Sequence, residues 1–163
     1  MITIKNTQRT YLVKKTALHK TIKKMLASIG LGDFDVSVWI TSDQTIRKFN
    51  KQFRNKDRPT DILSFPFHDE PITSDNAIFI LEEEKNLGDI IIAAPYAARQ
   101  AAHIWHRSFD QHMTALLAHG IAHLIGHEHN TDAEFKKMQH IEEKLIAAAI
   151  KKTKPKGKKH GKN

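Results

Sequence analysis

The chain has 163 residues, of which 40% are hydrophobic and 27% are charged, with a formal net charge of +8 and no cysteine. This length suits one domain with a real core and is short for two. Without cysteine there can be no disulfide bond or thiolate ligand, so a bound metal would have to use histidine and carboxylate side chains. No apolar run approaches the ~20 residues that span a bilayer, and the first residues do not resemble a secretory signal. We therefore expect a cytoplasmic protein with no membrane partner.

The positive charge is concentrated at the C-terminal end. Residues 151–163 contain seven lysines and no acidic residue, so the other 150 residues hold 19 basic and 18 acidic side chains. We expect a single folded domain over residues 1–150 and a basic, disordered tail over residues 151–163. The tail could contact RNA through its charge, or it could be a solubilising extension without a specific partner.

Strand and helix signals alternate from the N-terminus onward. Residues 1–5 favour an edge strand, and residues 18–29 carry apolar side chains at helical spacing, with Gly30 placed to end that helix. Polar and apolar residues alternate over 36–40, which indicates a second strand. Ser42 can then cap a short helix that follows.

The middle of the chain contains two further strand signals. Residues 62–67 form one, and Pro66 places it at a sheet edge. Residues 69–86 are acidic and predict an irregular surface excursion. The apolar run at 90–94 is typical of a strand buried on both faces, and Pro95 suits the first residue of the next helix.

Two helices are predicted in the C-terminal half of the body. Ser108 can cap the helix that carries His119 and His123, and Thr131 with Glu134 forms a capping-box pattern before a final amphipathic helix. These signals complete a chain of alternating strands and helices.

Residues 119–129 hold the clearest chemical pattern. His119 and His123 lie one helical turn apart, ~6 Å along the axis, so both imidazoles can converge on one zinc ion. His127 on a continued helix would lie ~12 Å from His119. Gly126 can instead adopt a left-handed conformation and end the helix, after which His129 can fold back as the third ligand. Three protein ligands leave a fourth position for water, which is the arrangement of catalytic zinc sites.

The histidine spacing is also similar to that of zinc peptidases of the metzincin type. Those enzymes need a glutamate beside the first histidine, where this chain has Gly120. A metallopeptidase is therefore the least favoured function. His112 lies on nearly the same helix face, ~10 Å from His119, and is expected to line the site or to face solvent.

The same segment resembles the signature of the YbeY family of single-strand-specific metallo-endoribonucleases, which are rRNA maturation factors. Other segments resemble the family in the same order along the chain. Before and after residues 119–129 (HGIAHLIGHEH), they are 53–66 (FRNKDRPTDILSFP), 87–92 (LGDIII) and the pair Glu134 and Met138. Two positions depart from the usual pattern: Glu128 replaces an aspartate, and Ala115 stands where a histidine is often found.

The resemblance implies the fold and the substrate. It implies a zincin-like α/β (α+β) fold, with a small mixed sheet of about four strands packed with about five helices. It also implies a zinc-dependent endoribonuclease that acts on single-stranded RNA, in 16S rRNA 3′-end maturation and in late-stage 70S ribosome quality control. The expected partners are 16S rRNA and the small ribosomal subunit, and no DNA substrate is expected.

The resemblance and the motif together assign roles to five residues. His119, His123 and His129 would hold one Zn²⁺ per chain, although three histidines also accept other divalent metals. Arg54 is the catalytic candidate, because a guanidinium binds phosphate in a bidentate manner while metal-bound water or hydroxide attacks the phosphodiester. Glu128 is the second candidate, as a carboxylate that orients a ligand or accepts a proton. The alternative is a non-catalytic rRNA-binding assembly factor with a structural zinc.

Overall fold

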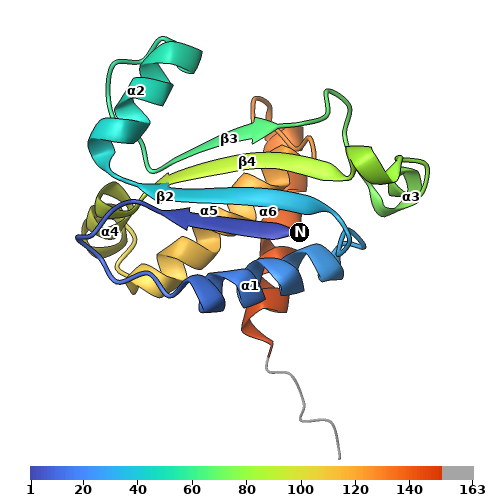
Figure 1. Cartoon of the computed structure of the whole chain (residues 1–163), viewed down its shortest axis with the longest axis horizontal. Helices are drawn as coiled ribbons and strands as arrows, with labels where there is room; N and C mark the ends of the chain where they lie inside the picture. Colours follow the sequence, from blue (N-terminus) through green and yellow to red (C-terminus); the bar gives the residue numbers. More distant parts are fainter. Residues whose placement is uncertain (152–163) are drawn as a thin grey trace, which may run out of the picture.

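The computed structural model describes residues 1–151 and contains one four-stranded sheet (Figure 1). Its strands are β1 (Ile2–Asn6), β2 (Asp35–Thr41), β3 (Ile62–Pro66) and β4 (Asn86–Ala93). They lie in the order β1-β2-β4-β3, with β1, β2 and β4 parallel and β3 antiparallel to β4. Most of the predicted basic tail, residues 152–163, lies outside the described residues.

Helices connect and cover these strands. They are α1 (Lys15–Ser28), α2 (Asp43–Arg54), α3 (Ser74–Ala77), α4 (Ala94–His103), α5 (Phe109–Leu124) and α6 (Asp132–Ile150), with a 3₁₀ turn at Glu82–Glu84. The predicted fold class, a mixed α/β fold with a small mixed sheet, is confirmed. The described residues form six α-helices instead of about five because the short α3 is added.

The sheet separates two unequal layers. Helices α1, α5 and α6 lie together on one side of it (Figure 1), over the main core. Val38, Ile40 and Ile90 point into that core and are at most 1% exposed. Alternate residues of the same strands, such as Leu63 and Ile91, form a smaller cluster under α2 on the other face, as the two-residue period of a strand requires.

Local signals in the sequence set the first residues of α5 and α6. Ser108 Oγ accepts a hydrogen bond from the amide of Gln111, whose side chain accepts one from the amide of Ser108. Thr131 and Glu134 make the same reciprocal pair at the start of α6. These predicted caps satisfy amides that the first helical turn leaves unpaired.

The prediction of an irregular excursion over residues 69–86 was only partly right. Thr73 and Asn76 form a capping box that starts α3, and Ala77 and Ile72 are buried. The amide of Ile72 donates to the carbonyl of Ile125, 3.2 Å away. The segment therefore packs against the end of α5 and does not extend into solvent along its whole length. Within residues 1–151, no helix has both the length and the apolar character to cross a membrane.

Candidate metal centre

Helix α5 ends at the turn that the glycine pattern predicted. Gly126 has φ +91°, its amide donates to His123 O at 3.0 Å, and the amide of His127 donates to Ala122 O at 3.0 Å. These two bonds form a Schellman motif, which reverses the chain after a helix. A Cβ on Gly126 would lie 2.8 Å from Pro71 Cα, so the turn is closed tightly against the preceding loop.

The reversal brings three imidazoles together. One nitrogen from each of His119, His123 and His129 lies within 4.8 Å of the other two. The ring centroids are 4.6 Å, 5.2 Å and 5.7 Å apart. His127, the alternative considered from the sequence, does not belong to this group. The three histidines could therefore hold one metal ion.

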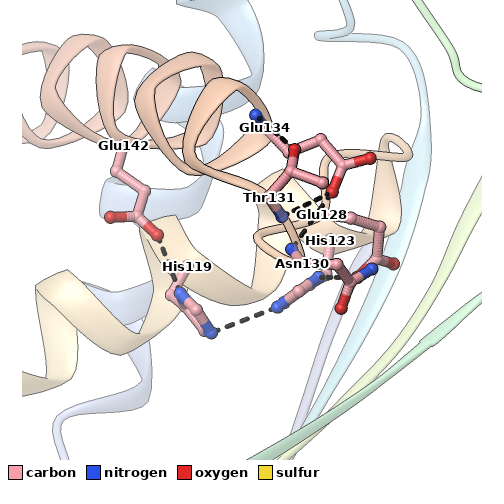
Figure 2. Close-up of polar contacts among 7 residues, drawn as sticks. All are labelled: His119, His123, Glu128, Asn130, Thr131, Glu134 and Glu142. Atoms are coloured by element: carbon pink, nitrogen blue, oxygen red, sulfur yellow. Dashed lines mark hydrogen bonds and ion pairs between the residues drawn. The ribbon is translucent and has the colours of Figure 1, made fainter.

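The spacing of the ring nitrogens and the protonation of His123 are compatible with a bound metal ion. Nε2 of His119 and Nε2 of His123 face each other at 3.2 Å (Figure 2). Two nitrogens bound to one zinc at ~2.1 Å and a tetrahedral angle would lie ~3.4 Å apart. Burial lowers the pKa of His123, and the neighbouring His119 lowers it further. His123 is therefore held neutral near pH 7, which is the form that binds metals.

A carboxylate stands behind each of the two helical histidines. Nδ1 of His119 lies 2.7 Å from Oε1 of Glu142 on α6, and Nδ1 of His123 lies 3.8 Å from Oε2 of Glu128 (Figure 2). Such partners fix the orientation and tautomer of a metal-binding imidazole. Glu142 is the closer of the two, whereas the Glu128 contact is too long for a hydrogen bond.

Glu142 was missed from the sequence although a signal was present. Met138 and Leu145 mark the buried face of α6, and Glu142 falls between them at helical spacing. A carboxylate inside an apolar stripe is expected to have a partner. Here that partner is His119, 23 residues earlier in the chain.

The histidines open into a cleft of about 550 Å³. Glu128 and Arg54 also line it, together with the loop and strand residues 60–66. Arg54 lies in the last turn of α2, which ends at Asn55 with φ 54°. Among residues 1–151 Arg54 has no ion-pair partner, whereas Asp57 pairs with Arg47 and Lys51. Within residues 1–151, Arg54 therefore lines the same cavity as the imidazoles without an ion pair that would compete for a phosphate.

Gly120 occupies the position where the peptidase pattern has its glutamate. The residue is buried where α5 crosses the sheet, and a Cβ on it would lie 2.8 Å from Ile90 Cδ1 and 3.0 Å from Ile62 Cδ1. A glutamate at this position would drive its carboxylate into the main core. The chain therefore lacks the glutamate base, and a glutamate at this position would have to displace the side chains of Ile90 and Ile62.

The expectation for His112 was wrong. The side chain is only 2% exposed, does not line the cleft, and packs against the Trp105 ring at a centroid distance of 6.5 Å. Within the described residues neither of its nitrogens has a hydrogen-bond partner. The sequence spacing placed it on the histidine face of α5 but could not show that Trp105 covers that part of the helix.

Comparisons with known proteins identify the class of enzyme. Curated relatives named "Endoribonuclease YbeY" include one from Aquifex aeolicus, 36% identical over 140 residues, covering 85% of this chain and 86% of the relative. Another, from Geobacter metallireducens, is 34% identical over 148 residues and covers 90% and 93%. The chain is therefore a hydrolytic endoribonuclease, and RNA is its substrate.

The family follows from the same findings. The family model described as "Endoribonuclease YbeY" matches residues 3–149, so the chain belongs to this family. The fold is also similar to the solution structure of TM1509 from Thermotoga maritima, with a TM-score of 0.62 and 26% identity. That match covers 91% of this chain and 89% of TM1509.

Proposed function

We propose that this endoribonuclease is zinc-dependent and specific for single-stranded RNA. His119, His123 and His129 are the proposed ligands, and the observation that carries the proposal is their convergence in the cleft that Arg54 also lines. The absence of cysteine leaves nitrogen and oxygen donors alone, and three imidazoles suit zinc better than magnesium or calcium.

The residues around the centre have separate tasks in this proposal. When bound, zinc supplies a Lewis acid and lowers the pKa of a coordinated water toward ~7. Arg54 binds the phosphodiester and offsets the negative charge that grows on its oxygens. Glu142 holds the ring of His119 by its Nδ1, and Glu128 faces Nδ1 of His123 from the rim of the cleft.

We further propose that the substrate is the 3′ end of 16S rRNA on the small ribosomal subunit, with a role in late-stage 70S ribosome quality control in the cytoplasm. Membership of the family supports this substrate. The basic residues 151–163 supply charge that suits an RNA partner. The cleft supplies the chemistry, and the tail would add affinity that depends on salt.

The experiment pairs metal content with cleavage. Purified chain should carry about one zinc and cut single-stranded RNA, and a chelator should abolish cleavage. His119→Ala should lose both metal and activity, whereas Arg54→Ala should keep the metal and lose at least about tenfold in cleavage rate. Arg58→Ala is the matched control, because Arg58 is exposed and does not line the cleft. Full activity in metal-free protein would refute the zinc-dependent mechanism.

Strand specificity needs its own comparison. The same RNA sequence is offered alone and annealed to its complement, and initial rates are measured at equal metal loading. Cleavage should fall at least about tenfold in the duplex, because a paired strand cannot turn its bases away from the helix. Equal rates on both substrates would contradict the proposed specificity.

A further inference from the structure

Four aromatic side chains form a continuous row on the face of the sheet where α2 packs. Trp39 contacts Phe49 edge to face at 5.6 Å, Phe49 stacks on Phe53 at 6.1 Å and 11°, and Phe53 meets Phe65 at 5.1 Å and 69°. The rings come from β2, α2 and β3. The row therefore joins elements that are distant in sequence, on the face opposite the main core.

Phe53 differs from its neighbours because it is both fixed and exposed. Its side chain is 56% exposed, although its ring contacts the rings of both Phe49 and Phe65. An aromatic ring held in place with a free surface loses little conformational entropy when a flat ligand stacks on it. Phe53 also precedes Arg54 directly, in the last turn of α2.

The row leads into the cleft. Phe53 and Phe65 line it together with Arg54 and the three histidines. At its other end, Phe49 and Trp39 line a second hollow of about 330 Å³ on the sheet face. The ammonium group of Lys5 lies 5.0 Å from the Trp39 ring there. The aromatic row thus connects two cavities, one of which contains the proposed reaction centre.

We propose that Phe53, supported by Phe49 and Phe65, is the stacking platform for a nucleobase next to the phosphodiester that is cleaved. The inference rests on the proposed function, since it places that base beside Arg54. Every nucleobase presents a flat π-face, so such a platform tolerates different sequences. It also requires an unpaired base, because bases within a duplex are already stacked on both faces. The platform gives the preference for single strands a physical basis.

The test measures binding and cleavage of a single-stranded oligoribonucleotide by the zinc-loaded full chain. Phe53→Ala should weaken binding about 5- to 150-fold, the range of stacking on one base, without changing the zinc content. Phe53→Leu keeps an apolar side chain but removes the aromatic ring, so it should show a similar loss. Phe53→Trp keeps an aromatic ring and should bind at least as well as the parent. Phe67→Ala is the matched control, since Phe67 is 54% exposed but does not line the cleft.

An abasic nucleotide identifies the stacked base. It is placed at each position of the oligonucleotide in turn, and the parent is compared with Phe53→Ala. At one position beside the cleavage site the two proteins should bind equally, because both lack the stack. A 2-aminopurine at that position should be quenched by the parent and not by Phe53→Ala. If Phe53→Ala binds as tightly as the parent, or if its deficit is the same at every abasic position, the platform is refuted.

Different results would refute the proposed endoribonuclease mechanism and the stacking role of Phe53. If the unsubstituted, zinc-loaded chain does not cut single-stranded RNA, the proposed function fails and the platform fails with it. If the parent cuts and Phe53→Ala cuts equally well, only the platform is overturned. Capture of a protein by this face without any effect of Phe53→Ala on RNA binding would also overturn it, and would assign the aromatic row to a protein partner.

Discussion

Glu142 gives the sharpest test of the metal centre, because it contacts a proposed ligand without being one. Its Oε1 lies 2.7 Å from Nδ1 of His119, and the side chains of His119 and Glu142 are 33% and 27% exposed. A hydrogen bond to a charged group contributes about 1.5–3 kcal/mol. Partial exposure to solvent reduces this to about 1–2 kcal/mol, which corresponds to about 5- to 30-fold in affinity.

The substitutions should therefore give a graded loss of zinc affinity. Glu142→Ala removes the contact, and we expect zinc binding to weaken about 5- to 30-fold, within the range found for partners of metal ligands. Glu142→Gln keeps an oxygen that can accept from Nδ1 but removes the charge, so its loss should be smaller. The measurement is competition with a zinc chelator of known affinity, on freshly demetallated protein at one pH.

A neighbouring residue provides the control. Glu143 lies beside Glu142 on α6 but is exposed to solvent, so Glu143→Ala changes the same net charge without touching His119. It should bind zinc as the parent does. An affinity of Glu142→Ala within twofold of the parent would refute the reasoning, and an equal loss in Glu143→Ala would show that the effect is general electrostatics.

Three further predictions concern the scaffold. Gly126→Ala should destabilise the chain by about 1–3 kcal/mol in urea unfolding and weaken zinc binding, because its φ is +91° and its Cβ would meet Pro71. Gly120→Glu should cost at least about 3 kcal/mol and yield no peptidase activity, since the carboxylate would enter the core beside Ile90. His112→Phe should reduce the loss of thermal stability between pH 7.5 and pH 5. Burial, and then the charge of Arg107, lower the pKa of His112 below 6.5, so the unfolded chain takes up the proton first. The contribution of neutral His112 to the free energy of unfolding is therefore fully present above about pH 6.5. Below that pH it falls by at most about 1.4 kcal/mol per pH unit. Parent-like stability of either glycine variant, or an unchanged pH dependence in His112→Phe, would contradict the corresponding argument.

The parts of the fold that the sequence predicted are those with local causes. A cap such as Ser108 or Thr131 acts on amides three residues away, and Gly126 acts on its own backbone. The convergence of His119 and His123 follows from one helical turn. Each of these features needs only a short window of sequence, which is why the positions of α5 and α6 and the turn between them were predictable.

The parts that were missed depend on contacts between distant elements. Glu142 meets His119 only because α6 packs across α5. His112 is buried because Trp105, before the helix, lies over it. The order β1-β2-β4-β3 likewise depends on which strands pair, and strands of similar apolar pattern do not reveal their partners. The sequence could predict which face of each helix or strand was apolar, but not which other element would pack against that face.

Gly120 lies at the contact between α5, which carries His119 and His123, and the sheet strands beside the cleft that Arg54 lines. Its missing side chain lets α5 lie directly on Ile90 and on Ile62, the first residue of β3. The strand β3 follows α2 in the chain, and Phe53 and Arg54 are the last two residues of α2. The close approach at Gly120 therefore brings α5, which carries His119 and His123, against β3, which lines the cleft together with Arg54. A larger residue at this position has to displace the side chains of Ile90 and Ile62, so we expect it to disturb the packing of α5 on β3 while every proposed metal ligand is still present.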